Sequence, residues 1–313
     1  MSRQDSNSLA VQTFKLTKHF NGLVAVAGID LEIKKGELFS LLGPNGAGKT
    51  TTVNMLCCLL KPTSGTAQVM GYDLGKEPFR IKELIGVAPQ DIAISEHLNC
   101  WENLSLIGKI HGMGAADVSK KSRELLEIVG LLERAKDQVR KFSGGMKRRL
   151  SLIMALIHDP QILFLDEPSL GLDPQARRTV WEYIKSLKVK KTILLTTHYM
   201  EEADSLSDRI AIIDEGKIVA LGTSEELKSR ATEKQTMIIL AENLNPGVIE
   251  SLRSKYPVVE QRNEEVLISA KNLNFKEITD YLYSQDITIH SATLKQPTLE
   301  DVFIQITGKE LRE

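Results

Sequence analysis

The sequence predicts an α/β fold with a mixed sheet, followed by a smaller α+β domain. Three observations carry this prediction. A glycine-rich turn at Gly43 to Thr50 stands between an apolar strand and a helix. A second apolar strand, 161–165, ends in two carboxylates. Beyond a polar stretch at 231–234, the elements follow the order β-α-β-β-α-β, which is typical of ferredoxin-like domains.

The composition is that of a globular protein with a domain of ordinary size and a smaller one. The chain has 313 residues, of which 42% are hydrophobic and 26% are charged. Forty basic and forty-one acidic residues give a net charge of -1, so nucleic acid is not expected as the main partner. The polar start predicts no signal peptide, and the longest apolar stretches are shorter than the roughly 20 residues of a spanning helix. Any membrane role is expected to be peripheral.

The first part of the chain predicts antiparallel strands behind a disordered tail at residues 1–9. Apolar and polar residues alternate at 11–16 and at 23–33, and Asn21-Gly22 predicts the turn between them. Phe20 precedes this turn. Its ring could stack on an adenine or could be a core or turn residue, and the sequence leaves both open. The three cysteines, Cys57, Cys58 and Cys100, lack metal-binding spacing and are expected to be reduced thiols.

Gly43 to Thr50 fits the pattern Gly-x-x-x-x-Gly-Lys-Thr of a phosphate-binding loop. A buried strand at 37–42 leads into it, and a helix at 51–60 is expected to lead out and to stop at Lys61-Pro62. Glycines let the backbone N–H groups surround an anion, and the helix N-terminus adds a positive dipole end. Lys49 then supplies a charge to the β- and γ-phosphates, and the Thr50 hydroxyl is a ligand for Mg²⁺.

Residues 91–158 predict a helical insert between two parts of the sheet. Phe142-Ser143-Gly144-Gly145-Met146 opens its last helix, with Ser143 as N-cap. The cations Lys147, Arg148 and Arg149 crowd the first turn, where each opposes the helix dipole by about 0.3–1 kcal/mol. Two interpretations remain open: a capped helix with a solvated basic face, or an anion-binding helix start.

The strand at 161–165 ends in Asp166 and Glu167, at the edge of a parallel sheet where ligands bind. Asp166 is placed to hold Mg²⁺, and Glu167 to deprotonate a water that attacks the γ-phosphate. A further buried strand at 192–197 ends in His198. A histidine in that position is a candidate for contacting the γ-phosphate.

The last segment, 235–313, contains no catalytic motif. Its expected elements are strands at 236–241, 257–261, 265–270 and 287–294 and helices at 246–254 and 274–284. A final helix begins with a capping box of Thr298 and Asp301 and ends at Gly308.

Together these pieces resemble the ATP-binding cassette (ABC) family of transport ATPases over about residues 9–230. The resemblance rests on an ordered set of motifs: Gly43–Thr50, Gln90, Phe142–Met146, Leu165–Pro168, Leu172-Asp173 and His198. In the family these are the Walker A, Q-loop, signature, Walker B, D-loop and switch-histidine positions. The sequence departs from the family where Phe20 replaces the more frequent Tyr, Phe142 replaces Leu and Met146 replaces Gln, which puts only minor contacts in doubt.

The resemblance implies a P-loop NTPase cassette at 10–230, with its helical subdomain at 91–158 and an antiparallel β subdomain, and an accessory domain at 235–313. It implies ATP contacts from Phe20, Gly43, Pro44, Asn45, Gly46, Ala47, Gly48, Lys49, Thr50, Thr51, Gln90, Ser143, Gly144, Gly145 and Asp173. It also implies Mg²⁺ at Thr50, Gln90 and Asp166, and catalytic roles for Glu167 and His198.

The family resemblance further implies two partners. Cassettes pair head to tail, so that the signature of one faces the γ-phosphate held by the other, and the basic turn at Lys147–Arg149 would face that anion. A second copy of the chain and an integral membrane permease are therefore expected, at the cytoplasmic face of a membrane. Pro297 to Phe303 resembles the ending of ATPase subunits of ABC-2-type, drug-resistance exporters, whose C-terminal domain is regulatory or supports the dimer.

Two rival functions would also use the phosphate loop: a soluble mechanical ATPase and a GTPase switch. A soluble ABC ATPase with a mechanical role on ribosomes or DNA usually has tandem cassettes or long coiled-coil inserts, and this sequence has neither. A GTPase switch needs a guanine-reading Asn-Lys-x-Asp motif, which does not occur in the chain. The sequence does not indicate the transported substrate.

Overall fold

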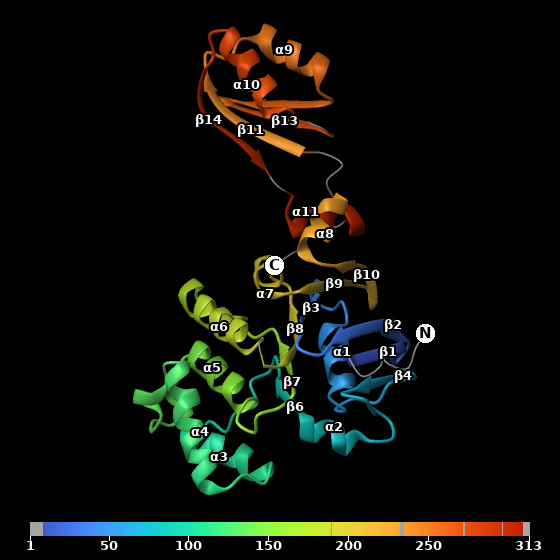
Figure 1. Cartoon of the computed structure of the whole chain (residues 1–313), viewed down its shortest axis with the longest axis vertical. Helices are drawn as coiled ribbons and strands as arrows, with labels where there is room; N and C mark the ends of the chain where they lie inside the picture. The colour runs from blue at the N-terminus through green and yellow to red at the C-terminus, as the bar shows by residue number, and fades with distance from the viewer. Residues whose placement is uncertain (1–8, 189, 232–234, 272, 296, 309–313) are drawn as a thin grey trace. The chain divides into compact units, whose positions relative to one another are not determined.

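The computed structural model describes residues 9–188, 190–231, 235–271, 273–295 and 297–308 (Figure 1). These residues divide into two compact units, one up to Ser224 and one from Glu225. The predicted tail therefore lies almost wholly outside the described residues, and so does most of the polar stretch at 231–234. None of the helices in the described ranges combines the length and the apolar character needed to cross a membrane. The domain limits at 230 and 235 remain predictions.

A six-stranded sheet is the centre of the first unit, with the order β10-β9-β3-β8-β7-β6. Its strands are β3 (Leu38–Leu42), β6 (Ile85–Ala88), β7 (Ile162–Asp166), β8 (Thr192–Thr197), β9 (Arg209–Asp214) and β10 (Lys217–Gly222). All neighbours pair in parallel except β9 and β10. The carboxyl ends of β3, β7 and β8 therefore meet at one edge, which is where the predicted phosphate loop and acidic pair arrive.

Both faces of this sheet are buried, which explains why its strands are continuous apolar runs. Side chains alternate between the two faces along a strand. In β7, Leu163 and Leu165 pack into a core with the helical insert, while Ile162 and Phe164 pack into a second core with an antiparallel sheet. The residues at the end of β7 are thus held from both sides.

The antiparallel sheet has the order β2-β1-β4-β5. Its strands are β1 (Leu9–Phe20), β2 (Leu23–Lys34), β4 (Ser64–Val69) and β5 (Tyr72–Asp73). The predicted turn at Asn21-Gly22 is confirmed, with both residues at positive φ. Leu9, which the predicted tail included, already pairs with Lys34 in the first strand pair.

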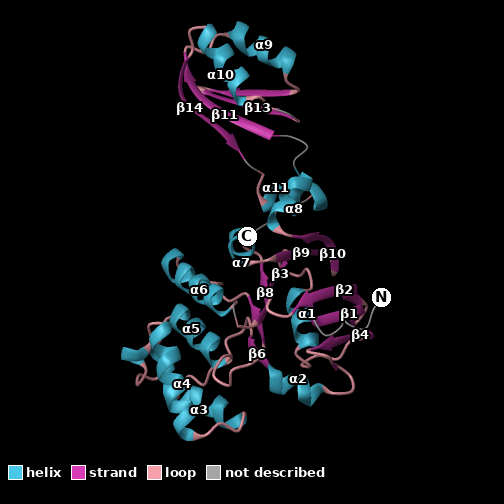
Figure 2. Cartoon of the chain, viewed as in Figure 1, coloured by secondary structure: helices cyan, strands magenta, loops and turns pink. Residues whose placement is uncertain are grey.

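The helices of the first unit are α1 (Lys49–Leu56), α2 (Pro78–Leu84), α3 (Cys100–Ile110), α4 (Ala115–Ile128), α5 (Gly144–Met154), α6 (Pro174–Leu187) and α7 (Met200–Leu206). Between β6 and β7, every element with regular hydrogen bonding in the described chain is helical, as predicted for the insert. Figure 2 shows α3, α4 and α5 grouped on one side of the central sheet. The last of them, α5, begins after Ser143 and contacts the edge strand β6.

The helix after the phosphate loop is shorter than predicted and begins earlier. It starts at Lys49 and ends at Leu56, whereas the sequence predicted 51–60. Cys58 has a left-handed backbone with φ 56°, which breaks the helical repeat well before Lys61-Pro62. The N–H groups of Leu59 and Leu60 both donate to the carbonyl of Asn54, so the chain coils back on the last turn.

The second unit contains the predicted β-α-β-β-α-β order. Its elements are α8 (Ser224–Ala231), β11 (Gln235–Glu242), α9 (Pro246–Lys255), β12 (Val258–Arg262), β13 (Glu265–Ala270), α10 (Phe275–Ser284), β14 (Thr288–Lys295) and α11 (Leu299–Thr307). The strands are antiparallel in the order β12-β13-β11-β14, the arrangement of a ferredoxin-like domain. The capping box of Thr298 and Asp301 and the left-handed Gly308 bound α11 as predicted.

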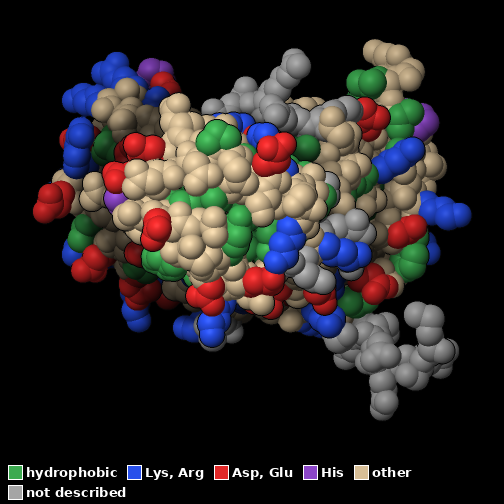
Figure 3. Space-filling view, turned by 90° about the horizontal axis from the view of Figure 1, so that it is seen from above, with side chains coloured by type: hydrophobic (Ala, Val, Ile, Leu, Met, Phe, Trp, Pro, Cys, Tyr) green, Lys and Arg blue, Asp and Glu red, His purple; other side chains and the backbone are tan. Residues whose placement is uncertain are grey.

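Surface charges follow the near-neutral composition. Figure 3 shows basic and acidic side chains interspersed over the face that it presents. The three cysteines are free thiols; Cys57 and Cys100 are buried and Cys58 is half-buried. Their predicted state as unpaired thiols is confirmed.

Candidate active site

The turn at Gly43 to Thr50 requires glycine at particular positions. A Cβ atom on Gly43 would lie 2.2 Å from the Ile213 carbonyl oxygen, and one on Gly48 would lie 2.4 Å from that of Ala25. Gly48 also has φ 102°, which L-residues rarely adopt. Gly48 is the N-cap of α1 and supplies no side-chain cap, so the first N–H groups of the helix are left for an anion. The backbone of this turn therefore suits a phosphate.

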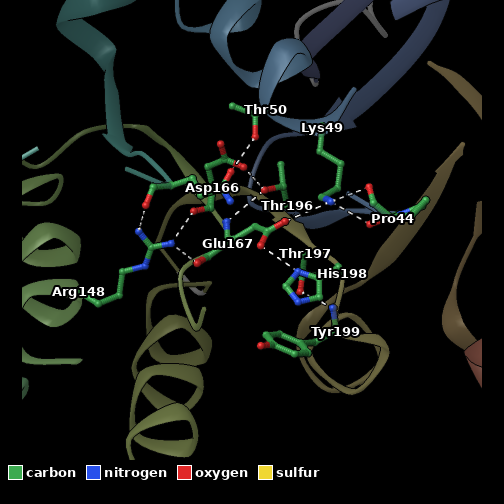
Figure 4. A network of polar contacts seen from close by, with 12 residues as sticks. Pro44, Lys49, Thr50, Arg148, Asp166, Glu167, Thr196, Thr197, His198 and Tyr199 are labelled. Carbon is green, nitrogen blue, oxygen red and sulfur yellow. Dashed lines mark hydrogen bonds and ion pairs between the residues drawn. The ribbon is translucent and has the colours of Figure 1, made fainter. Parts of the chain in front are cut away.

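Lys49 is turned inward, toward its own loop and Glu167. Its Nζ atom donates to the carbonyls of Gly43 at 2.8 Å and Pro44 at 3.1 Å and forms an ion pair with Glu167 Oε1 at 3.1 Å (Figure 4). The side chain is 5% exposed. These contacts hold the charge of Lys49 at the loop, next to the carboxylate at the end of β7.

The two carboxylates at the end of β7 are both buried. Asp166 is 2% and Glu167 is 4% exposed. The Thr196 hydroxyl, from the neighbouring strand β8, donates to Asp166 Oδ1 and also accepts from the Glu167 N–H at 3.1 Å. One hydroxyl therefore fixes both acidic residues to β8.

Glu167 has a left-handed backbone, with φ 49°. Such a conformation in a residue other than glycine costs on the order of 1–3 kcal/mol and persists only where its surroundings hold it. The N–H group of Glu167 is held by the Thr196 carbonyl at 3.1 Å. Its own carbonyl accepts from Arg148 of α5. This conformation turns the Glu167 side chain back toward Lys49.

Glu167 is ionised near neutral pH. Burial acts to raise the pKa of its carboxyl, but the hydrogen bond with His198 and the charge of Lys49 outweigh it, and the pKa lies below the usual range. His198 Nδ1 lies 2.8 Å from Glu167 Oε2. Because an ionised carboxylate only accepts, this nitrogen carries the proton. The structure thus brings Lys49, Glu167 and His198 together as predicted, in the form of one chain of contacts.

The predicted magnesium ligands offer only oxygen atoms. The Thr50 hydroxyl donates to Gln90 Oε1 at 3.3 Å, and Asp166 ends the adjacent strand. A hydroxyl, an amide and a carboxylate suit Mg²⁺, which takes few protein ligands and fills its shell with water and phosphate oxygens. In the part of the chain that the structure describes, no group of three His, Cys, Asp or Glu residues could hold a metal by itself. These residues therefore fit an ion that arrives with phosphates.

The glycine turn before α5 has few contacts of its own. Ser143 caps the helix by accepting from the Met146 N–H at 3.3 Å. Ser143 and Gly144 are exposed, and a Cβ atom on Gly144 would meet nothing within 4 Å. Among the described residues, no hydrogen bond or ion pair joins this turn to Lys49 or Glu167. On one chain it faces solvent.

The basic turn behind Ser143 behaves differently from the prediction. We expected Lys147–Arg149 to face an anion of a partner chain, and this is wrong for Arg148 and Arg149, whose guanidinium groups bond to carbonyls of their own chain. Arg148 is 5% exposed and turned into its own chain. Arg149 donates to the Val129 carbonyl at 2.7 Å, and Lys147 pairs with Glu96. Each cation has a partner within the chain, which offsets its unfavourable place in the helix dipole.

Two predicted ATP contacts lie at the surface. Phe20 ends β1 and is 43% exposed, which excludes the core alternative, and Lys18 Nζ lies 5.0 Å from the centre of its ring. Asp173 is the N-cap of α6 and accepts from the Ala176 N–H at 2.9 Å. The ATP contacts predicted for both stay predictions. The remaining loop residues, Pro44, Asn45, Gly46, Ala47 and Thr51, lie in the turn or in the first turn of α1.

Sequence reasoning missed Thr196 and Glu202 and gave Arg148 a different role. Thr196 is a polar residue in an apolar strand next to His198, and that position was the available signal. Glu202, in the first turn of α7, is fully buried, accepts from Trp181 Nε1 at 2.8 Å, and has a pKa raised by burial. Nothing in its exposed-looking sequence context, Tyr199-Met200-Glu201-Glu202, signals that burial.

Family comparisons agree with the geometry. The family model described as "ABC transporter" matches residues 26–170. The model described as "ATP-binding protein DrrA1-3-like, C-terminal domain" matches residues 222–307. The two matches fall on the two units of the structure.

Curated relatives match nearly the whole chain. The linearmycin resistance ATP-binding protein LnrL of Bacillus subtilis is 40% identical, over 97% of this chain and 100% of that protein. The daunorubicin/doxorubicin resistance ATP-binding protein DrrA of Streptomyces peucetius is 36% identical, over 96% and 92%. The Nod factor export ATP-binding protein I of Cupriavidus metallidurans is 37% identical, over 97% and 99%.

Solved structures match the first unit. The dimeric ATP-binding cassette MJ0796, in a post-hydrolysis state bound to ADP and Pi, has a TM-score of 0.64 and 27% identity, and the match covers 68% of this chain and 98% of that one. With a phosphate loop, an acidic strand end and a histidine in contact, and with relatives of this extent, the chain belongs to the ATP-binding, ATP-hydrolysing subunits of the ABC transporter family.

Proposed function

We propose that two copies of this chain bind ATP with Mg²⁺ between them and hydrolyse it to drive an ABC-2-type exporter. One observation carries the proposal. Lys49 of the phosphate loop and both carboxylates are buried and bonded within one chain, while Ser143 and Gly144 are exposed. A second copy that places its signature turn over the first copy's phosphate loop would complete the site, and two such sites would form by symmetry.

In this proposal ATP takes over the contacts of Lys49. The β- and γ-phosphates attract its ammonium away from the Gly43 and Pro44 carbonyls and from Glu167. Glu167 then keeps His198 as its partner and is free to orient and deprotonate the attacking water. The hydrogen bond with His198, which acts to lower the pKa of Glu167, favours the basic form of its carboxyl. Catalysis is mainly positioning and electrostatic stabilisation of the transferred phosphoryl group.

Magnesium would be held by Thr50, Gln90 and Asp166. The ion supplies charge neutralisation for the phosphate oxygens. The contact between Thr50 and Gln90 shows that both side chains already reach one point. Asp166 keeps one oxygen on Thr196, so its carboxylate is oriented before any ligand arrives.

The membrane subunit is proposed to dock at a groove beside Gln90. A cavity of about 330 Å³ lies between the central sheet and the helical insert, and Leu59, Pro89, Ile107 and His111 are among its lining residues. Apolar side chains stand free nearby, with Leu59 63% and Ile110 69% exposed. Exposed apolar groups beside a groove mark interaction sites. Pro89 immediately precedes Gln90, so a displacement of Pro89 by a docked membrane subunit would move Gln90 at the nucleotide site.

The cargo is proposed to belong to the compounds for which the relatives are named, which are linearmycin, daunorubicin or doxorubicin, and Nod factors. The chain would work at the cytoplasmic face of the membrane. In the alternative, a mechanical ATPase without a membrane partner, the groove would have no function in transport.

The experiment is co-purification from detergent-solubilised membranes with the tagged full-length chain. We expect an integral membrane protein to copurify, and Ile110→Glu to abolish its recovery while ATP hydrolysis by the purified chain is unchanged. The matched control is Ile128→Glu, a 51% exposed isoleucine at the end of α4, whereas Ile110 ends α3 directly before the lining residue His111. Recovery of the chain only from the membrane-free fraction would favour the mechanical alternative.

A further inference from the structure

Arg148 is the most extensively bonded side chain at the site, and no motif assigned above uses it. Its Nη1 atom donates to the carbonyls of Pro89 and Gln90, each at 2.8 Å. Its Nη2 atom donates to the carbonyl of Asp166 at 3.0 Å and to that of Glu167. Figure 4 shows the guanidinium beside the strand end that carries the two acidic residues.

The carbonyls that Arg148 binds belong to the residues that the reaction needs. Gln90 reaches Thr50 through its side chain, and Glu167 reaches Lys49 and His198. Glu167 also has the left-handed backbone described above, and Arg148 binds the carbonyl of that residue. The guanidinium therefore fixes the direction of the peptide group that aims the Glu167 side chain.

Arg148 also connects these groups to the signature turn. It lies on α5, the helix that Ser143 caps, one and a half turns from the cap. A rigid helix transmits a small displacement of its first turn along its length. Contact of a partner's phosphate with Ser143 and Gly144 would thus displace α5. Arg148 would transmit this displacement to the carbonyls of Gln90 and Glu167.

We propose that Arg148 is a positioning residue that couples closure of the signature turn to the alignment of Glu167 and Gln90. This inference rests on the proposed role of Glu167 and on the proposed pairing of cassettes. Only arginine suits the position, because its planar fork presents paired N–H groups to two segments at once, whereas the ammonium of lysine is a single point. The remaining donor, Nε, is buried and has no hydrogen-bond partner in the described chain.

The test compares Arg148→Ala with Arg149→Ala in the full-length chain. Arg149 is the adjacent cation on α5, and its guanidinium donates to the carbonyl of Val129 in the helical insert. For Arg148→Ala we expect kcat for ATP hydrolysis to fall about 100-fold, since small misplacements of a catalytic group have effects of that size. Binding of a fluorescent ADP analogue should stay within about 2-fold, because the phosphate loop does not touch Arg148. Arg149→Ala should leave both quantities near those of the unchanged chain.

Chemical rescue separates positioning from general stability. Guanidinium ion at millimolar concentration should raise kcat of Arg148→Ala at least 5-fold, while equal concentrations of sodium or urea should not. If the alanine variant does not fold, Arg148→Lys serves in its place, with an expected loss in kcat of about 10-fold and unchanged ADP binding.

Several results would overturn the inference. They are a normal kcat for Arg148→Ala or Arg148→Lys, an equal loss for Arg149→Ala, or a parallel loss of ADP binding. Failure of the proposed function looks different: the unchanged chain would not hydrolyse ATP, or Glu167→Gln would hydrolyse it normally. A working enzyme that depends on Glu167 but not on Arg148 would contradict the coupling role alone.

Discussion

The two glycine turns of the first unit differ in how completely one chain satisfies them. At Gly43 to Lys49, close backbone contacts require glycine at 43 and 48, and a φ of 82° favours it at 46. The lysine is bonded to its own loop and to Glu167. At Ser143 to Gly145, the serine and the first glycine are exposed, and a side chain on Gly144 would meet nothing. Close contact or a positive φ accounts for the first set of glycines, but neither accounts for Gly144. In the proposed pairing of two cassettes, the reason for Gly144 lies in a second molecule.

The largest expected effect comes from Glu167, the carboxylate that contacts Lys49 of the first turn. Glu167→Gln should lower kcat by about 10²–10⁴, because the amide cannot accept the proton of the attacking water. Binding of ATP should persist or strengthen, since Lys49 loses its ion-pair partner. Steady-state hydrolysis and a fluorescent ATP analogue measure the two quantities. Glu124→Gln, at an exposed position of α4, is the control; normal hydrolysis by Glu167→Gln would reject Glu167 as the base.

The second effect tests the exposed turn. Gly144→Asp should leave the single chain as stable or slightly more stable, because an acid in the first helical turn gains about 0.3–1 kcal/mol from the dipole. Hydrolysis should nevertheless fall about 100-fold, because the carboxylate would repel a partner's γ-phosphate. Thermal melting and ATPase assays give the two readings. Gly247→Asp makes the same change in the first turn of α9 and should affect neither activity nor ADP binding.

Asp173 caps a helix of its own chain and is proposed to contact the nucleotide site of a partner. It caps α6, so Asp173→Ala should cost about 1 kcal/mol of stability, while Asp173→Asn keeps the cap and costs little. If its charge also serves the paired site, both variants should lose hydrolysis by about 10-fold, the size expected for one charged hydrogen bond. Chemical denaturation and ATPase assays distinguish the roles. Full activity in Asp173→Asn would confine Asp173 to capping.

The smallest effect concerns the buried carboxyl of Glu202. Burial raises its pKa in the folded chain, so its ionisation destabilises the fold as pH rises above the unfolded value. Glu202→Gln keeps an acceptor for Trp181 and removes the charge. We expect a higher melting temperature at pH 8, equivalent to about 1 kcal/mol for each unit of the pKa shift, and a difference that shrinks toward pH 4.5. A gain that does not vary with pH would contradict this cause.

The sequence predicted the parts of the fold that local chemistry determines. Strands buried on both faces are continuous apolar runs, and the motif at Gly43 to Thr50 joins one of them to a helix. The ferredoxin-like unit was recoverable because its turns and caps, such as Thr298 with Asp301, are local in the chain. The same holds for the ends of β7 and β8, where Asp166, Glu167 and His198 stand next to apolar runs.

What the sequence did not reveal depends on contacts between distant segments. Arg148 was assigned to a partner's anion because a basic first turn looks unsatisfied along the helix. Its actual acceptors lie 58 and 59 residues before it and 18 and 19 residues after it. The early end of α1 depends on the left-handed Cys58, a conformation that no local propensity indicates for cysteine.

The most direct measurement of the divided site is the mass of the Glu167→Gln chain by analytical ultracentrifugation, with and without ATP and Mg²⁺. The account predicts that ATP converts single chains into pairs, or tightens existing pairs, and that adding Gly144→Asp to the same chain abolishes this response while one ATP per chain still binds. Pairing by ATP that is equally strong with Gly144→Asp would contradict the claim that the exposed turn of one chain completes the phosphate loop of another.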